Sequence, residues 1–134
     1  MQSPTLPPLK PCSTPQAVID EHFDALNKGD WGRAIAQYSD NVEIFLQGGD
    51  VIKGRKDVGD LFWGFLKPRS EGGLLGIQFE TLHSFRVDDT FHIQWRITAE
   101  FLAEPYIGSD SYAVKDGVLW AQVSTLKFSD LKFK

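Results

Sequence analysis

Apolar residues recur with helical spacing in the first half of the chain. The clearest run covers residues 58–66, and its apolar members follow the i, i+3, i+4, i+7, i+8 pattern of an amphipathic helix: Val58, Leu61, Phe62, Phe65 and Leu66. A second run starts at Thr14-Pro15, because threonine is a good helix cap and proline fits the first turn. Gly29 ends that run and Asp30 opens a short third one, so the pattern predicts three helices.

Beyond the third helix the period changes from helical spacing to alternation. Residues 75–87 and 91–101 each alternate apolar and polar side chains, which indicates two unusually long strands. Two more strands flank the turn at Asp116-Gly117, and a short hairpin turns at Gly48-Gly49. Strands of this length must coil or bulge, so the sheet should be strongly bent. The pattern predicts an α+β fold, with three amino-terminal helices packed in the concavity of a strongly curved antiparallel sheet.

The chain of 134 residues has the length of one domain. Residues 1–14 contain four of the seven prolines and few apolar side chains, so we expect an extended or disordered arm before a single domain over residues 15–130. The first residues carry no secretory leader pattern, and no apolar run approaches the ~20 residues of a membrane span. The lone cysteine, Cys12, excludes an intramolecular disulfide, and we expect a cytoplasmic protein with no membrane partner.

Composition narrows the function. A net charge of −4 argues against nucleic-acid binding, which needs a cationic face to neutralise phosphates. No pair of histidines has the spacing of metal ligands, and we expect neither a metal nor another cofactor. Aromatic residues make up 13% of the chain, which is enough to fill a large core or to line an apolar ligand pocket.

One carboxylate is hard to place in this pattern. In the segment "YIGSDSYAVKDG", Asp110 has the same strand parity as Tyr106, Tyr112 and Val114, so these side chains share a face. Asp110 either lines a pocket, where it transfers a proton or donates a hydrogen bond to a carbonyl oxygen, or caps a turn at an exposed strand end. In a pocket, desolvation should raise its pKa, and a protonated His22 nearby should couple to it.

Further candidates occupy inward-facing positions. His22 falls on the apolar stripe of the first helix and is either a core histidine or the catalytic partner of Asp110. The aromatic and polar side chains expected to line the pocket or to fill the core are Tyr38, Trp63, His83, Trp95, Tyr112, Trp120 and Gln122.

Two segments near the ends of the domain carry a family resemblance. "HFDALNKGDWGRAIAQYSDNVEI" and "GSDSYAVKDGVLWAQVSTLKF" resemble the opening and the closing hairpin of the nuclear-transport-factor-2-like (NTF2-like) superfamily, in particular its SnoaL-like branch. The likeness covers about residues 15–128 and implies a cone-shaped fold that hosts isomerases, cyclases, epoxide hydrolases, dehydratases and binding modules. The resemblance to ketosteroid isomerase places His22 at the position of that enzyme's oxyanion tyrosine and Asp110 at the position of its protonated oxyanion-hole aspartate. Leu46 stands where that enzyme has its catalytic base, which makes the same isomerisation mechanism unsuitable here.

Two hypotheses for the function follow. The first is a small-molecule pocket protein of SnoaL-like type that binds an apolar, oxygen-bearing ligand. If it is catalytic, the resemblance implies cofactor-free acid/base chemistry next to a carbonyl, such as cyclisation, isomerisation or dehydration. The alternative is a non-catalytic module for ligand binding, dimerisation or docking. A cavity that holds Asp110 and His22 favours the enzyme, and one plugged by Trp95, Trp120 and Phe101 favours the module.

We also expect a homodimer packed through the outer face of the sheet, since helices cover only the other face. The outward positions carry a polar but lightly charged set, namely Gln78, Glu80, Leu82, Gln94, Arg96 and Thr98.

Overall fold

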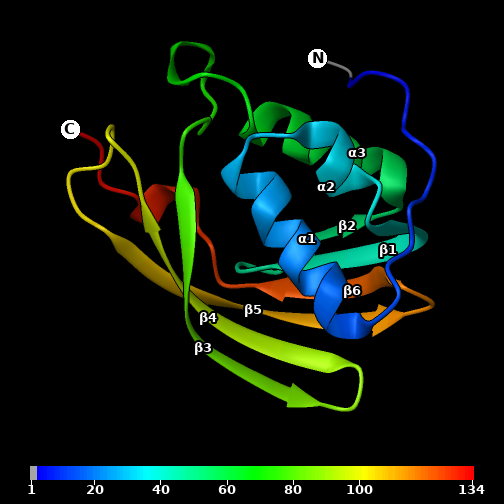
Figure 1. Cartoon of the computed structure of the whole chain (residues 1–134). Coiled ribbons are helices and arrows are strands. Elements are labelled where there is room, and N and C mark those ends of the chain that lie inside the picture. The colour runs from blue at the N-terminus through cyan, green and yellow to red at the C-terminus, as the bar shows by residue number, and fades with distance from the viewer. Residues whose placement is uncertain (1–2) are drawn as a thin grey trace.

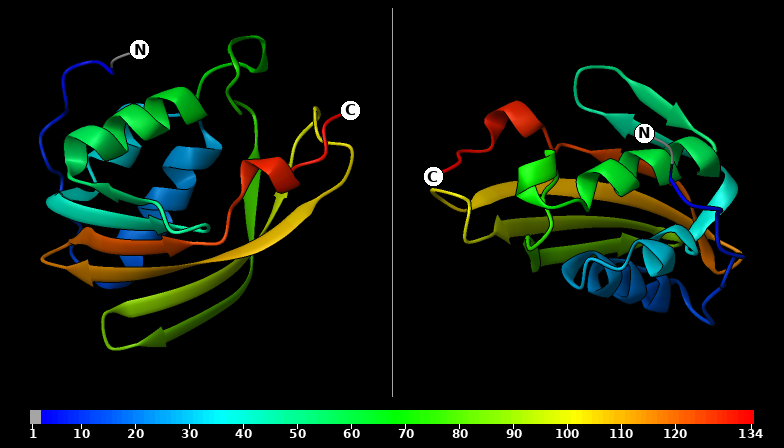
Figure 2. Two further views of the ribbon diagram at one scale, coloured as in Figure 1. Left: turned by 180° about the vertical axis from the view of Figure 1, so that it is seen from behind. Right: turned by 90° about the horizontal axis from the view of Figure 1, so that it is seen from above.

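Three helices lie against one face of a bent six-stranded sheet in the computed structural model, which describes residues 3–134 (Figure 1, Figure 2). The helices are α1 (Pro15–Asn27), α2 (Trp31–Ile35) and α3 (Arg55–Phe65). The Thr14 hydroxyl caps α1 by accepting from the Ala17 N–H at 3.1 Å, and Asp30 caps α2 by accepting from the Arg33 N–H at 3.1 Å. The three helices and the two caps predicted from the sequence are therefore confirmed.

The six strands form one sheet in the order β2-β1-β6-β5-β4-β3. Their bounds are β1 (Tyr38–Leu46), β2 (Val51–Lys53), β3 (Gln78–Val87), β4 (Thr90–Thr98), β5 (Tyr106–Lys115) and β6 (Val118–Ser124). Two single 3₁₀ turns, η1 (Arg69–Glu71) and η2 (Phe128–Asp130), follow α3 and β6. The α+β class predicted from the change of period is confirmed.

The sheet is mixed rather than purely antiparallel. β1 runs parallel to β6, with Ile44 opposite Gln122, while the other four neighbouring pairs are antiparallel. The prediction of a purely antiparallel sheet fails for this pair because alternation gives a strand's faces but not its direction. Direction follows from the sequence only where a short turn joins two neighbours, and residues 47–117 separate β1 from β6.

The parallel β1–β6 pair has a register shift between Tyr38 and Glu43, and two further shifts interrupt the antiparallel pairs of the long strands. One lies in the β3–β4 ladder between Thr81 and His83, and the other in the β5–β6 ladder between Ala113 and Val114. An extra residue on one strand increases the local twist and bends the sheet, as expected for strands of this length. Each of these two further shifts also reverses the face to which the following side chains point.

The amino-terminal segment lies extended against the domain. Its backbone is anchored by two hydrogen bonds, from the Lys10 N–H to the Ala36 carbonyl and from the Cys12 N–H to the Gly117 carbonyl, each at 3.0 Å. The buried Arg55 guanidinium donates to the Pro7 carbonyl, which ties the arm to the start of α3. Residues 3–14 therefore cover one end of the helices and the β5–β6 turn.

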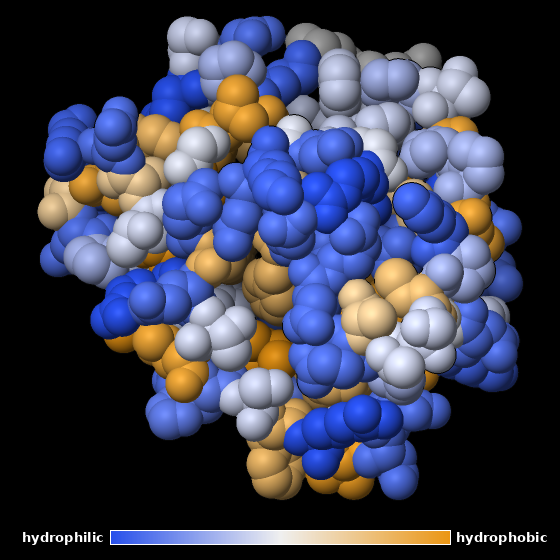
Figure 3. All heavy atoms as spheres, viewed as in Figure 1, coloured by the Kyte–Doolittle hydropathy of each residue, from blue (hydrophilic) through white to orange (hydrophobic). Residues whose placement is uncertain are grey.

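The core lies between the helices and the concave face of the sheet. The largest buried side chains there include Trp95, Phe91, Ile93 and Ile97, which all point inward from β4. The face of the molecule seen in Figure 3 is mostly hydrophilic, with apolar atoms in scattered patches. None of the helices in residues 3–134 is long and apolar enough to cross a membrane.

Candidate functional site

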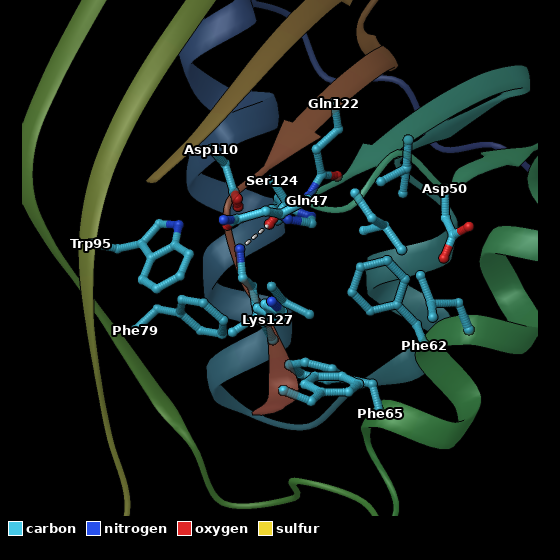
Figure 4. A pocket seen from close by; sticks show the side chains of 17 residues that line it. Gln47, Asp50, Phe62, Phe65, Phe79, Trp95, Asp110, Gln122, Ser124 and Lys127 are labelled. Atoms are coloured by element: carbon cyan, nitrogen blue, oxygen red, sulfur yellow. Dashed lines mark hydrogen bonds between the residues drawn. The ribbon is translucent and has the colours of Figure 1, made fainter. Parts of the chain in front are cut away.

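A cavity of about 210 Å³ lies between the helices and the concave face of the sheet (Figure 4). Its walls are mostly apolar and come from α1, α3, β1, β3, β4, β5 and β6, with the segment after β6 closing one side. The lining residues with polar side chains are His22, Gln47, Asp50, Trp95, Asp110, Gln122, Ser124 and Lys127. Among these, Gln47, Asp50 and Lys127 are exposed, whereas His22, Trp95, Asp110 and Gln122 are buried, so the polar groups form an outer rim and a deep inner set.

Asp110 on β5 belongs to the inner set. Its side chain is only 6% exposed, and the buried Tyr112 hydroxyl donates to its Oδ2 atom at 2.5 Å. Its Oδ1 atom has no hydrogen-bond partner among the described residues. Burial raises the pKa of this carboxyl, and the smaller opposing effects come from the nearby Ser124 hydroxyl, the Tyr112 hydroxyl and the Trp95 indole. The pocket-lining interpretation of its strand parity agrees with this geometry, and the exposed turn-cap interpretation does not.

His22 on α1 is fully buried beside the same cavity. Four aromatic rings surround its imidazole at centroid distances of 5.3–6.4 Å, namely Phe23, Tyr38, Phe62 and Tyr112. Burial lowers the pKa of His22 to about 3, so the ring is neutral at neutral pH. The expected coupling between a protonated His22 and Asp110 is therefore wrong, because desolvation removes the charge that the coupling requires.

Unpaired polar atoms concentrate in this cavity. Within residues 3–134, the buried side-chain nitrogen and oxygen atoms without a hydrogen-bond partner are Nδ1 and Nε2 of His22, Nε1 of Trp95 and Oδ1 of Asp110. All three residues line the cavity. Leaving such an atom unpaired costs about 1–3 kcal/mol, and buried polar atoms are nearly always paired in native proteins. The inner end of the cavity therefore offers donors and acceptors to a molecule that enters it.

Two of the predicted pocket residues lie one layer behind the cavity wall. Tyr112 lies behind Asp110, and its hydroxyl donates a hydrogen bond to the Asp110 carboxyl. Tyr38 donates to Gln122 Oε1 at 2.7 Å, and Gln122 itself lines the cavity. Burial raises the pKa of both tyrosines well above the usual value, so both hydroxyls remain donors at neutral pH. Their role in the site is to orient the acceptors of Asp110 and Gln122.

Two predicted lining residues point away from the cavity because of the register shifts. After the shift in β3, His83 pairs with the outward-facing Gln94 and is exposed. In β6, Trp120 is the extra residue between Leu119, which pairs with Val114, and Ala121, which pairs with Ala113. Its indole N–H donates to the Lys115 carbonyl at 3.0 Å, outside the cavity. Simple alternation along the strand gave the wrong face for both residues.

Trp63 also lies outside the cavity. It is half-buried on α3 and contacts Trp31 edge-on, with ring centroids 5.5 Å apart. It lines a separate groove between α3 and the carboxyl-terminal segment. Helical periodicity explains this, since Phe62 and Phe65 take the inward positions of α3 and leave Trp63 on its flank.

Several lining residues were not predicted from the sequence. Phe79 and Ser124 lie on the inner face, and the loop residues Gln47, Asp50 and Lys127 form the outer rim. The position of the loop residues in the chain could have predicted the outer rim, because loops at the open end of a curved sheet border any cavity inside it. Leu46, at the position that the isomerase comparison gives to the catalytic base, does line the cavity, but its side chain cannot accept a proton.

The part of the chain that the structure describes contains no cluster of side chains that could bind a metal ion. Over residues 3–134, no three His, Cys, Asp or Glu side chains gather closely enough to hold a metal ion. Any chemistry in the cavity that uses this chain's own groups therefore falls to the carboxyl, imidazole, indole, amide, hydroxyl and amine groups that line it.

Comparisons with solved structures identify the fold. An epoxide hydrolase/cyclase-like enzyme, SalBIII of salinomycin pyran ring formation, aligns with 90% of this chain and 95% of its own at 15% identity and a TM-score of 0.70. A protein proposed to be a SnoaL-like polyketide cyclase from Shewanella putrefaciens CN-32 aligns with 86% of this chain and 80% of its own, at 13% identity and a TM-score of 0.68. A proposed ketosteroid isomerase from Kribbella flavida DSM 17836 aligns with 83% of this chain and 76% of its own, at 20% identity and a TM-score of 0.65. At these identities the likeness concerns the fold alone.

Sequence comparison gives the family. No curated protein sequence matches the chain. The model of the SnoaL-like domain, however, matches residues 19–133, which include every helix and strand from most of α1 to β6. The three helices, the curved sheet and the cavity between them agree with that match, and the resemblance predicted from the two end segments is confirmed. The chain belongs to the SnoaL-like domain family and has the NTF2-like cone fold.

Proposed function

We propose that this protein binds a small apolar molecule that carries an oxygen atom at its buried end. The observation that carries the proposal is the concentration of unpaired polar atoms of His22, Trp95 and Asp110 at one apolar cavity. An apolar body would fill the space between Phe62, Phe79 and the other hydrophobic walls, and its oxygen would pair the inner polar atoms.

The same geometry suits acid/base chemistry next to a carbonyl group. A neutral Asp110 would donate a hydrogen bond to the carbonyl oxygen and so stabilise the negative charge that develops there when a neighbouring C–H bond breaks, and the unprotonated ring nitrogen of the neutral His22 would accept the proton that leaves the carbon. His22 is neutral and would hold the ligand through one ring nitrogen rather than through charge. Leu46 excludes the proton transfer of a steroid isomerase at that position, which favours cyclisation or dehydration with Asp110 as the acid/base group. The presence of cyclase-like enzymes among proteins of this fold supports this class of reaction.

Binding and proton transfer are tested together with the bicyclic ketone α-tetralone. Titration into ¹⁵N-labelled protein, up to the solubility of the ketone, should shift the amide resonances of residues around the cavity. In D₂O, the enzyme hypothesis predicts accelerated exchange of the hydrogens on the carbon next to the carbonyl. Asp110→Asn should retain the fold and slow that exchange by about 10²–10⁴-fold. Asp116→Asn, at an exposed turn with φ +53°, is the matched control and should change nothing.

The possible results separate the hypotheses. Binding with exchange that depends on Asp110 supports the enzyme. Binding without exchange supports a ligand-binding module. A titration in which no cavity resonance moves with α-tetralone contradicts the proposal.

A specific observation also favours the homodimer. One row of outward-facing residues crosses all six strands, and its members pair in the order Val51, Phe45, Val123, Ser111, His92 and Phe85. Its apolar members are open to solvent, with Phe85 67%, Val123 51% and Phe45 41% exposed. We propose that a second copy of the chain covers this row, since large apolar side chains are exposed on both sides of its polar Ser111–His92 pair.

A further inference from the structure

Trp95 differs from the other aromatic residues of the core. Its side chain is fully buried, yet its indole Nε1–H has no acceptor among the described residues. Trp31 and Trp120 do have acceptors, the carbonyls of Gly59 and Lys115, at 2.9 and 3.0 Å. Buried indole N–H groups usually find a partner, so the isolation of this one requires an explanation.

The indole of Trp95 faces the inner polar end of the cavity. Figure 4 shows its nitrogen turned toward Asp110, which lies on the neighbouring strand β5. The indole is close enough to favour the charged form of Asp110, but the two groups are not hydrogen-bonded to each other. One donor and one carboxyl oxygen therefore face the same space, and neither satisfies the other.

Gly108 makes this position of the indole possible. It lies directly opposite Trp95 in the β4–β5 ladder. A Cβ atom at position 108 would lie 2.5 Å from Cη2 and 2.9 Å from Cζ3 of the Trp95 ring. The Gly108 backbone is not in the left-handed region, so the missing side chain matters here and not the freedom of the backbone. Phe79 and Tyr106 contact the ring at centroid distances of 5.5 and 6.0 Å and hold it over Gly108.

We propose that Trp95 is a ligand-binding residue whose indole N–H donates to the same buried ligand oxygen that Asp110 Oδ1 contacts, and that Gly108 positions the indole for this bond. The inference rests on the small-molecule function proposed above and adds the chemical class of the buried group. Since indole is only a donor, the ligand atom must be an acceptor. Tyr112 occupies Asp110 Oδ2 as a donor, so a proton on the carboxyl lies on Oδ1 and provides the second donor.

Two donors that meet at one oxygen select a carbonyl. A ketone oxygen has two lone pairs and accepts both hydrogen bonds. An alcohol accepts with an sp³ oxygen and brings its own proton into a space that already holds two donors. A hydrocarbon leaves both donors unpaired, which is costly in a buried site. The structure therefore predicts the affinity order ketone, alcohol, hydrocarbon for ligands of one shape.

Three bicyclic probes of nearly equal shape test this order: α-tetralone, α-tetralol and tetralin. The chain has four tryptophans, so the spectrum of ¹⁵N-labelled protein should contain four indole N–H resonances, and the one missing in Trp95→Phe belongs to Trp95. α-Tetralone should move that resonance downfield, whereas tetralin should not. In Trp95→Phe the affinity for α-tetralone should fall about 5–10-fold, the usual effect of losing one hydrogen bond, while the affinity for tetralin stays within about twofold.

Two further variants separate positioning from folding. Gly108→Ala should reduce the affinity for α-tetralone as Trp95→Phe does, because the new methyl group displaces the ring. Trp120→Phe removes an indole N–H outside the cavity and should leave all three affinities unchanged. The shift of the Trp95 resonance in the unaltered protein needs no substitution, so it remains decisive if a variant does not fold.

The outcomes distinguish this inference from the function on which it rests. If α-tetralone binds in the cavity but neither moves the Trp95 resonance nor loses affinity in Trp95→Phe, the role of Trp95 is rejected and the small-molecule function stands. If neither α-tetralone nor tetralin binds, the proposed function fails and the inference fails with it.

Discussion

The hydrogen bond from Tyr112 to Asp110 gives the sharpest test of the inner site. Tyr112→Phe removes only the hydroxyl that donates to Asp110 Oδ2 at 2.5 Å, and it leaves the ring that packs against His22. Asp110 Oδ1 already has no partner, so the variant buries a carboxyl whose two oxygens are both unpaired. An unpaired buried acceptor costs about 1–3 kcal/mol, with the upper part of that range for a charged group. We expect the free energy of unfolding to fall by about 1 kcal/mol when Asp110 is protonated and by about 2–3 kcal/mol when it is charged.

The sign of the pH dependence follows from the raised pKa of Asp110. A folded-state pKa above the unfolded value gives stability that is fully present below the unfolded pKa and is lost as pH rises through the folded pKa. The Tyr112 hydroxyl opposes this rise because it favours the carboxylate. Without the hydroxyl the folded pKa rises further, so the variant loses more stability than the parent protein as pH rises. The cost of Tyr112→Phe should therefore increase as pH rises from the ordinary aspartate value of 3.8 through the raised folded pKa of Asp110.

Urea unfolding at several pH values measures this cost through the linear dependence of the free energy on denaturant. Tyr38→Phe is the matched control, since Tyr38 is equally buried and donates at 2.7 Å to the uncharged Gln122 amide. Its cost should be about 1 kcal/mol and independent of pH. A cost of Tyr112→Phe that stays equal at every pH at which the protein folds, or that stays below about 0.5 kcal/mol throughout, would refute the reasoning.

Three further predictions concern other parts of the molecule. The pKa of His22 is about 3 in the folded protein and 6.5 in the unfolded chain, so between these values only the unfolded chain binds the extra proton. His22→Leu should therefore flatten the fall in unfolding free energy as pH drops from 6.5 toward 4. An unchanged slope would contradict a neutral buried imidazole. Val123→Glu should convert a dimer into a monomer in analytical ultracentrifugation, whereas the control Ser70→Glu, at an exposed position, should leave the dimer intact. A parent protein that is monomeric at high micromolar concentration rejects the sheet dimer. Asn27 holds the backbone N–H and carbonyl of Phe79 at 2.7 and 3.1 Å, so Asn27→Ala should cost about 1–3 kcal/mol in urea unfolding, and Asn27→Asp, which keeps only the acceptor, should cost less.

The fold was readable from the sequence where local patterns decide the structure. The helical stripe of residues 58–66 and the caps at Thr14 and Asp30 depend on contacts within a few residues, and they form as the pattern predicts. The parallel pairing of β1 with β6 depends on contacts across 70 residues or more, such as Tyr38 with Leu119, and no local pattern encodes it.

The site was readable to the same extent. Asp110, His22 and Trp95 line the cavity because no register shift intervenes between them and the parity or helical stripe that placed them. His83 and Trp120 were misplaced because a single extra residue in a ladder reverses the face, and alternation does not reveal where that residue falls. The sequence could not predict which buried polar atoms lack a hydrogen-bond partner. The Trp95 N–H lacks one because the ring occupies the space left by Gly108 on the next strand, which is a contact between distant residues.

The place of β6 in the sheet has a consequence for the order in which the protein can be assembled during synthesis. β6 is the last of these six strands to be synthesised, yet it joins β1 and β2 to the three strands on its other side. Until Val118–Ser124 is available, the amino-terminal helices with β1 and β2 form one fragment, and the β3–β4–β5 meander forms another with an unsatisfied edge on β5. A nascent chain that lacks this strand must therefore remain open and prone to aggregation, and the cavity forms only when β6 pairs with β1 and β5 of the two fragments made before it.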